Sequence, residues 1–497
     1  MQAAAAVACL LAATACGADA PGAAGPSTPP AAQVNAHPEP GPASPQPPAG
    51  DTPGPGTGPA VDFDGDGYSD LALEGRRSAA EAPGKGSGDG GAGEAGAAYV
   101  GAVFGGENGL DPDRRVVLTR DDLDLPAAEP EPGPVRRLGV TGTADLDDDG
   151  FTDMVVAGEG RYVVWGGPDG PAGPANPLPW QEPGPGAASA VSYAVADFDG
   201  DGAVDVFRFT EVGPYRYDAR LLRGPFDRSG EPSTTSAVPL PPSATTAEDI
   251  LSGRVVPFDA AGAGRGSELL FLRHEDESPV SHIVLRSVGG GAAPEVLGET
   301  PAGHELAAGD VDGDGTPDLL VGAHGIPNNE NQLGETDPEL HPGYVEVYSG
   351  ADGFAAGEPE RITRALPGVA GRPTDADGFG DLVMAADVQG DGYADVIVGP
   401  KLRGDEWRVT VVSGSAAGAT SARTVGLEPP APGADEDAAV TAEAVRDYNG
   451  DGAADLLMIN RSAGGEDWTR GHAAYALYPG TGEGFSAVPA RFSTEHF

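Results

Sequence analysis

Carboxylates are concentrated in one short stretch of the sequence, DFDGDGYSDLAL at residues 62–73. Aspartates at its first, third and fifth positions can turn inward around one point, and the glycine at the sixth position allows the sharp turn this requires. The backbone carbonyl of Tyr68 and both carboxylate oxygens of Asp70 would close an all-oxygen cage. Such donors suit Ca²⁺, whereas Mg²⁺ keeps its waters and zinc prefers His or Cys. The stretch predicts a calcium site.

The same pattern recurs along the chain, which favours metal cages over an acidic surface turn. Near-intact copies begin at Asp62, Asp145, Asp197, Asp310, Asp387 and Asp447. About six Ca²⁺ ions are therefore expected, one for each of these copies. The predicted metal ligands are Asp62, Asp64, Asp66, Tyr68, Asp70, Asp145, Asp147, Asp149, Phe151, Asp153, Asp197, Asp199, Asp201, Ala203, Asp205, Asp310, Asp312, Asp314, Thr316, Asp318, Asp387, Gln389, Asp391, Tyr393, Asp395, Asp447, Asn449, Asp451, Ala453 and Asp455.

The copies are not equivalent. Gln389 and Asn449 replace the third aspartate in two of them, which removes one charge, and the longer Gln389 predicts weaker binding. A worn seventh copy starts at Asp259 and has Arg265 in its middle. Either this guanidinium takes the place of the ion and pairs with Asp259 and Glu268, or the segment is an ordinary solvated loop. An EF-hand is excluded, because the twelfth position lacks the required Glu and holds Leu73, Val156, Val321 or Met458 inside an expected strand.

Two apolar runs follow each copy, and the second run generally ends in Gly. These runs are short, partly β-branched and bounded by Gly and Pro, so they predict strands, and no helical periodicity competes with them. Successive copies start 51 to 83 residues apart, which suits a four-stranded antiparallel unit with variable loops. Seven such units must stack to bury their faces. The expected fold is all-β, a seven-bladed β-propeller of four-stranded antiparallel blades.

Composition and the N-terminal segment indicate which partners are excluded, that the protein is exported, and how the chain is divided into domains. The formal net charge of −48 excludes binding to nucleic-acid phosphates. Residues 1–16 are expected to form an export signal, and LLAATACG resembles a lipoprotein signal with lipidation at Cys16, although cleavage after Ala15 by an ordinary signal peptidase also fits. Residues 17–60 are rich in Pro, Gly and Ala and predict a disordered tether, followed by the propeller at 61–497.

The copies resemble the FG-GAP repeats of the integrin-α type, and the related bacterial VCBS repeats. The fullest match is FGDLVMAADVQGDGYADVIVGP at 379–400, followed by LAAGDVDGDGTPDLLVGAHG at 306–325. The resemblance implies a seven-bladed propeller with calcium in the hairpin between the first two strands of a blade. It also implies that partners bind the opposite face, through loops joining the second and third strands, here 75–96, 324–343 and 461–472. It does not imply an enzyme.

Two classes of function follow. The first is a monomeric, non-catalytic calcium-binding module for adhesion at the cell surface, which contacts an extracellular protein or glycan and meets the membrane only through the N-terminal lipid. The alternative is a secreted propeller enzyme of the polysaccharide lyase or phosphodiesterase type. The sequence has no HExxH motif, no nucleophile elbow of the GxSxG type and no cysteine beyond Cys16, which favours the first class.

Overall fold

The computed structural model describes most of the chain beyond the N-terminal segment, and all statements below concern those residues. They belong to one compact unit, Pro47–Phe497. The described residues are 61–76, 97–126, 138–179, 191–213, 216–240, 255–258, 268–271, 281, 283–286, 295–325, 342–350, 358–374, 377–400, 407–430, 440–461 and 473–497.

Seven antiparallel sheets account for these residues, and six of them have four strands. The first sheet has three strands, β1 (Leu71–Arg76), β2 (Ala98–Phe104) and β3 (Asp111–Thr119). The second sheet consists of β4 (Gly139–Ala144), β5 (Asp153–Ala157), β6 (Arg161–Trp165) and β7 (Ala172–Pro177). The third consists of β8 (Val191–Ala196), β9 (Asp205–Gly213), β10 (Arg216–Arg223) and β11 (Thr234–Ala237). The fourth consists of β12 (Val255–Phe258), β13 (Glu268–Phe271), β14 (Ile283–Arg286) and β15 (Glu295–Glu299). The last three are β16 (Glu305–Gly309), β17 (Asp318–Ala323), β18 (Tyr344–Tyr348) and β19 (Glu360–Ile362); β20 (Leu382–Ala386), β21 (Asp395–Gly399), β22 (Arg408–Ser413) and β23 (Ser421–Gly426); and β24 (Val440–Arg446), β25 (Asp455–Asn460), β26 (Ala474–Tyr478) and β27 (Ala490–Ser493).

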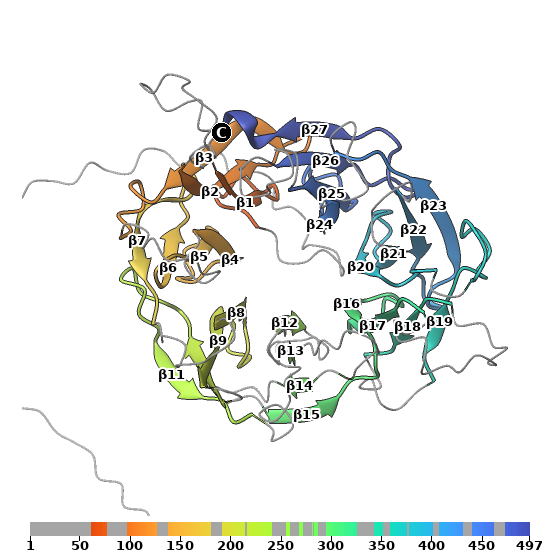
Figure 1. The fold of residues 1–497 in the computed structure, drawn as a ribbon, viewed down its shortest axis with the longest axis horizontal. Coiled ribbons are helices and arrows are strands. Elements are labelled where there is room, and N and C mark those ends of the chain that lie inside the picture. Colours follow the sequence, from red (N-terminus) through yellow and green to blue (C-terminus); the bar gives the residue numbers. More distant parts are fainter. Residues whose placement is uncertain are drawn as a thin grey trace, which may run out of the picture. The chain divides into compact units, whose positions relative to one another are not determined.

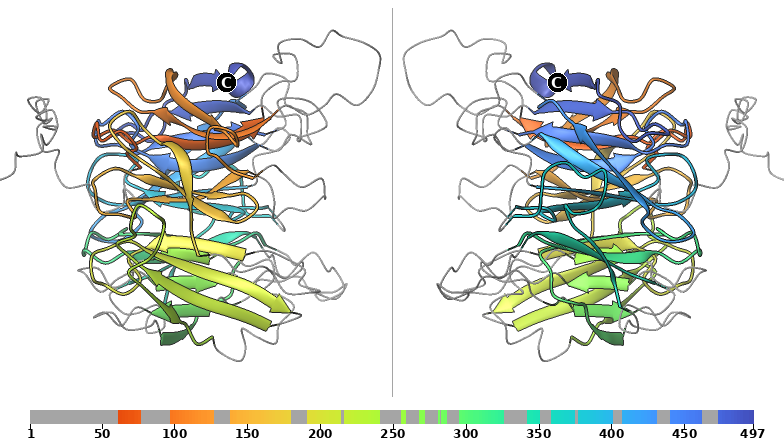
Figure 2. Two further views of the ribbon diagram at one scale, coloured as in Figure 1. Left: turned by 90° about the vertical axis from the view of Figure 1, so that its left-hand side faces the viewer. Right: turned by 90° about the vertical axis from the view of Figure 1, so that its right-hand side faces the viewer.

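The sheets are arranged radially around a common axis, as Figure 1 shows. The first strands of successive blades lie innermost and contact one another, for example β4 with β8 and β16 with β20. In the side views the strands run roughly parallel to the axis of the ring (Figure 2). The predicted all-β propeller is therefore confirmed. The described residues contain one short 3₁₀-helix, η6 (Thr494–His496), and no helix with the length and hydropathy that a membrane span requires.

The expectation of seven four-stranded blades is wrong in one respect, because only six sheets have four strands. In those repeats that keep the motif, the acidic turn joins the first strand to the second, as between β20 and β21. In the first sheet the turn at Asp62 precedes β1. β1 thus holds the position of a second strand, and the described residues supply no strand inside it.

The second strands form the core of each blade. β21 and β25 are buried along their whole length, and so they read in the sequence as continuous apolar runs instead of alternating ones. Outer strands such as β11 are mostly exposed. Apolar residues of neighbouring blades pack into shared clusters, which join the sheets because a single blade cannot bury both of its faces.

The ring closes by packing between the last blade and the first, without a shared strand among the described residues. β27 pairs with β26 of its own blade. Phe497 belongs to the same buried cluster as Leu71 and Leu73 of β1, and the guanidinium of Arg115 lies 4.5 Å from its ring centre. The amide of Gly106 also donates to the carbonyl of Tyr448 across this junction, at 3.3 Å.

Candidate metal sites

The ninth aspartate of each near-intact copy fixes the local fold. Asp70 accepts the amide of Phe63 at 2.7 Å with one oxygen and the amide of Gly105 at 2.8 Å with the other. Gly105 directly follows β2, the third-strand equivalent, so one buried carboxylate links the acidic turn to the far side of the sheet. The same two bonds recur in the other five copies, at Asp153, Asp205, Asp318, Asp395 and Asp455.

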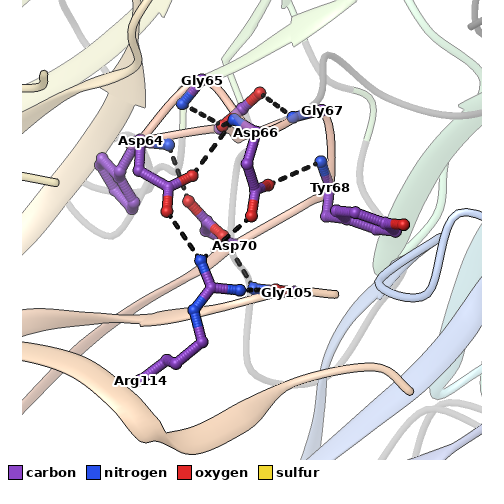
Figure 3. A network of polar contacts seen from close by, with 10 residues as sticks. Asp64, Gly65, Asp66, Gly67, Tyr68, Asp70, Gly105 and Arg114 are labelled. Carbon is purple, nitrogen blue, oxygen red and sulfur yellow. Dashed lines mark hydrogen bonds and ion pairs between the residues drawn. The ribbon is translucent and has the colours of Figure 1, made fainter. Parts of the chain in front are cut away.

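The first aspartate organises the turn itself. One oxygen of Asp62 accepts the amides of Gly65 and Asp66, at 2.7 and 3.1 Å, and the other accepts the amide of Gly67 at 2.9 Å (Figure 3). Gly65 and Gly67 have φ angles of 74° and 88°, in the left-handed region that favours glycine. The sequence predicted the need for glycine at the sixth position. The fourth position also needs a left-handed conformation. In the second copy this position holds Asp148, whose φ of 59° is strained for a residue other than glycine.

The carboxylates of four copies converge closely enough to hold a metal ion. In each of these copies three carboxylates offer oxygens that all lie within 4.8 Å of one another. The groups are Asp62, Asp64 and Asp66; Asp145, Asp147 and Asp153; Asp197, Asp199 and Asp205; and Asp310, Asp312 and Asp318. These are the copies that keep all four aspartates. The carbonyl ligands expected at Tyr68, Phe151, Ala203, Thr316, Tyr393 and Ala453 stay predictions.

The two amide-containing copies keep the turn but lack a third converging carboxylate. Asn449 uses its carbonyl oxygen to accept the amide of Asp451 at 2.8 Å and donates to the carboxylate of Asp451 at 3.1 Å. Gln389 donates instead to the carbonyl of Gly482, at 3.3 Å. Its own carbonyl oxygen is buried without a hydrogen bond, which leaves it available as a ligand.

The electrostatics of the four-aspartate copies fit a bound cation. Burial, together with the neighbouring carboxylates, raises the pKa of Asp64, Asp199 and Asp312 above the ordinary value. Burial also raises the pKa of Asp70 to about 7, although two backbone amides oppose the shift. Asp199 is fully buried, and its oxygens form no hydrogen bond apart from the ion pair with Arg223. Hard, crowded oxygen donors of this kind match Ca²⁺.

The turns of neighbouring blades are linked to one another. The carbonyl of Asp62 accepts the amide of Thr152 in the next blade at 2.7 Å, and the amide of Asp62 donates to the Thr152 hydroxyl at 2.9 Å. Equivalent bonds join Asp310 to Ala394, at 2.9 Å, and Asp387 to Ala454, at 2.7 Å. An ion held in one turn would therefore also stabilise the junction between two blades.

Sequence reasoning missed the glycines that meet the ninth aspartates. A Cβ atom on Gly414 would lie 2.4 Å from the carbonyl oxygen of Ala394, and one on Gly105 would lie 2.3 Å from that of Ser69. Only glycine lets the backbone approach so closely. The indication was present in the sequence, because the second apolar run of most repeats ends in Gly.

A cleft of about 670 Å³ lies along β1, between β4 and β24. Four arginines line it, Arg76, Arg161, Arg446 and Arg461, together with Glu74 and Glu443. The rest of the lining is formed mostly by the backbone and side chains of β1 and β4. The lining extends from Leu71 and Arg446, next to the acidic turns, to Arg76 and Arg461 at the other ends of the same sheets.

Several predicted features lie outside the described residues. These are Cys16, the tether at 17–60, most of the loops expected at 75–96, 324–343 and 461–472, and the turn of the worn copy with Asp259 and Arg265. The backbone of β13 includes Glu268, but its side chain is also outside the described part.

Comparison with protein-family models places this geometry in a known class. Residues 145–207 match an FG-GAP-like repeat, and residues 302–333 match an FG-GAP repeat. The matches fall on the copies that start at Asp145, Asp197 and Asp310, three of the four with converging carboxylates. The chain therefore carries FG-GAP repeats on a β-propeller. No curated protein sequence matches it.

Several solved structures are similar to this chain at low sequence identity. An Agrocybe aegerita lectin that recognises non-reducing terminal N-acetylglucosamine is 16% identical, with a TM-score of 0.45, over 80% of this chain and 90% of the lectin. The Photorhabdus luminescens Tc holotoxin pore is 14% identical, with a TM-score of 0.32, over 78% of this chain and 18% of that one. A subtype N11 neuraminidase-like protein of a flat-faced bat virus is 9% identical, with a TM-score of 0.27, over 66% and 76%. Scores this low carry no argument about function.

Proposed function

We propose that this protein is a calcium-stabilised, non-catalytic binding module that acts outside the cell. The observation that supports this most directly is the convergence of three carboxylates within 4.8 Å in four copies of one turn. Burying such groups together is costly unless a cation neutralises them. Calcium is available at high concentration outside cells, where sites of modest affinity fill.

The partner surface is the cleft along β1. Its lining carries four arginines against two glutamates, in a chain whose formal net charge is −48. Glu443 accepts from Arg461 at 3.0 Å, and Glu74 accepts the amide of Val140 at 2.9 Å, so both glutamates are engaged within the protein. The charge of the cleft is therefore opposite in sign to the net charge of the chain. This favours a partner, an extracellular protein or glycan, that presents an anionic group.

Metal content and thermal stability test the calcium sites. The full chain is dialysed against calcium, its bound metal is measured, and its melting temperature is recorded with and without a chelator. We expect up to six bound ions and a clear loss of stability on chelation, since each filled site contributes about 2.7 kcal/mol at one hundred times its dissociation constant. A chain that binds no calcium and melts identically with the chelator contradicts the proposal.

A paired screen separates a binding module from an enzyme. Arrays of glycans and matrix proteins are probed with the calcium-loaded protein, and the same sample is tested on lyase, phosphodiesterase and hydrolase substrates. Binding without turnover is expected. The reverse result would support the alternative of a propeller-based secreted enzyme.

Export and anchoring are part of the same proposal. The apolar segment before Cys16 would direct secretion, and lipidation of Cys16 would hold the propeller at the cell surface. Intact mass of the protein extracted from membranes checks this, because diacylation adds a mass that Cys16→Ser abolishes.

A further inference from the structure

Arginine side chains reach into three of the four aspartate clusters. One terminal nitrogen of Arg114 lies 3.0 Å from Asp64 and 3.1 Å from Asp66 (Figure 3). The guanidinium of Arg228 pairs with Asp147 at 2.5 Å and also with Asp149. The Nε of Arg223 lies 2.6 Å from Asp199. These oxygens belong to predicted calcium ligands.

The three arginines come from different places in the chain but arrive at one place in the blade. Arg114 belongs to β3 of the same blade and lies 5.6 Å from the ring centre of Phe104. Arg228 comes from the blade after its cluster and lies 5.0 Å from the ring of Trp165. Phe104 and Trp165 are equivalent, because each directly precedes the glycine that binds the ninth aspartate.

The third cluster follows the same plan with one substitution. Arg223 itself precedes Gly224, the glycine that donates to Asp205 at 3.0 Å. Arg223 thus takes the position that Phe104 and Trp165 hold in the first two blades. A guanidinium therefore lies at the same location in three blades, although it comes from a different chain position in each. This recurrence indicates that the arginine is part of the architecture of these sites.

The later clusters differ, because the described residues place no arginine in them. Among the ion pairs of the described residues, none reaches the turns at Asp310, Asp387 or Asp447. Ser349, Ser413 and Pro479 occupy the position before the glycine in these three blades. Within the described part of the chain, the cluster at Asp310 therefore combines four aspartates with no arginine or lysine paired to them.

We propose that Arg114, Arg223 and Arg228 are internal competitors of calcium, so that the site at Asp310 fills first and the three N-terminal sites fill at higher calcium. This inference rests on the proposed calcium binding. Calcium needs the same carboxylate oxygens that the guanidinium contacts, and each ion pair must break before the metal enters. Arg114 and Arg228 are about half exposed, at 47% and 52% of the side chain, and can move into solvent.

How strongly each arginine weakens calcium binding depends on how deeply its ion pair is buried. Exposed ion pairs are weak, so removal of Arg114 or Arg228 is expected to tighten its own site about two- to ten-fold. Arg223 is only 15% exposed and faces the fully buried Asp199, so its removal should tighten that site by more than about ten-fold if the fold persists.

A local reporter can follow one site at a time. In protein labelled with 5-fluorotryptophan, the ¹⁹F resonance of Trp165 is identified by its loss in Trp165→Phe. Trp165 precedes Gly166, which donates to Asp153 of the Asp145 site, so calcium entering this site changes the field at the ring and shifts its resonance with or without Arg228. We expect Arg228→Gln to reach its midpoint at lower calcium than the wild type, with Arg228→Lys between them. Arg220→Gln is the matched control, because Arg220 pairs with Asp218 and contacts no cluster.

Calorimetric titration of the full chain tests the order of filling. Asp312→Asn should remove the tightest class of sites, whereas Asp147→Asn should remove a weaker one. Arg114→Gln should tighten one class, and Arg115→Gln, whose side chain contacts Phe497 instead, should leave the isotherm unchanged.

The outcomes distinguish this inference from the proposed function. Calcium binding by the wild type with no tightening in any of the arginine variants overturns the inference and leaves the calcium sites standing. Absence of calcium binding in the wild type and in all variants overturns both. Binding that appears only after an arginine is removed supports the competition directly.

Discussion

At the scale of single residues, the ninth aspartate is the most constrained group of each repeat. It is buried in all six copies, and both of its oxygens accept backbone amides from segments that are far apart in sequence. Its charge also faces the other aspartates of the turn. These demands conflict when no cation is present, because hydrogen bonding favours the ionised form and burial disfavours it.

The metal-free protein should therefore lose stability as the pH rises. Burial raises the pKa of Asp395 in the folded state to about 7, from 3.8. The folded state then binds more protons than the unfolded state between these values, so unfolding becomes easier as the pH increases through this range. With chelator present, the melting temperature should be higher at pH 5 than at pH 8.

Two comparisons check the origin of this effect. Saturating calcium should remove or reverse the slope, since the metal binds the ionised carboxylates. In Asp395→Asn the melting temperature should depend less steeply on pH, whatever its absolute value. A slope that is unchanged by both would contradict the assignment.

Gly414 should not tolerate a side chain. Its Cβ would meet the carbonyl oxygen of Ala394 at 2.4 Å and that of Val311 at 2.8 Å. Gly414→Ala is expected to cost about 1–3 kcal/mol in the free energy of unfolding, by denaturant titration. Gly426→Ala is the control, because nothing lies within 4 Å of that position, and it should be neutral within about 0.5 kcal/mol.

At the scale of elements, the acidic turn is both a hairpin connection and a contact between blades. Its second residue is an apolar anchor, as with the fully buried Phe63, Leu146 and Val388. Its first carbonyl accepts an amide from the following blade in several copies. The proposed metal binding, the hairpin geometry and the association of blades thus depend on the same nine residues.

The side chain of Thr152 offers a direct test of this coupling. Its hydroxyl accepts the amide of Asp62 at 2.9 Å across the junction of the first two blades. Thr152→Val leaves that amide without a partner and should cost about 1–2 kcal/mol in thermal or denaturant unfolding. Thr235→Val, at an exposed position of β11, should have almost no effect. Equal behaviour of the two variants would show that the junction does not need the bond.

At the scale of the whole molecule, the described contacts that close the ring are mainly side-chain packing, with the backbone bond from Gly106 to Tyr448 beside it. Phe497 is 8% exposed and packs with residues of both the first and the last blade. The aromatic ring of Tyr68 also lies against Gly450, where a Cβ atom would approach it to 2.8 Å. Among the described residues, the junction therefore has fewer hydrogen bonds to lose than a sheet with a shared strand.

Truncation of this closing contact should destabilise the entire ring. Phe497→Ala is expected to lower the free energy of unfolding by about 3–5 kcal/mol, because a buried aromatic ring is removed. Val488→Ala is a suitable control, since Val488 is 76% exposed. Hydrogen exchange should report the loss in β1 and β26 together if the closure joins the two blades, and in β26 alone if it does not.

The turns were predictable from sequence because their chemistry is local. Asp62, Asp64, Asp66 and Asp70 lie within nine residues, and the hydrogen bonds that shape the turn span at most seven. Repetition then indicated the propeller, since seven similar units that cannot bury their own faces must stack.

Contacts between distant segments were decided only by the tertiary structure. The bond from Gly105 to Asp70 spans 35 residues, and the ion pair of Arg114 with Asp64 spans 50. The three-stranded first sheet, the arginines in the N-terminal clusters and the cleft along β1 all depend on which faces of neighbouring sheets meet. No local pattern encodes that choice, because it is set by packing around the complete ring.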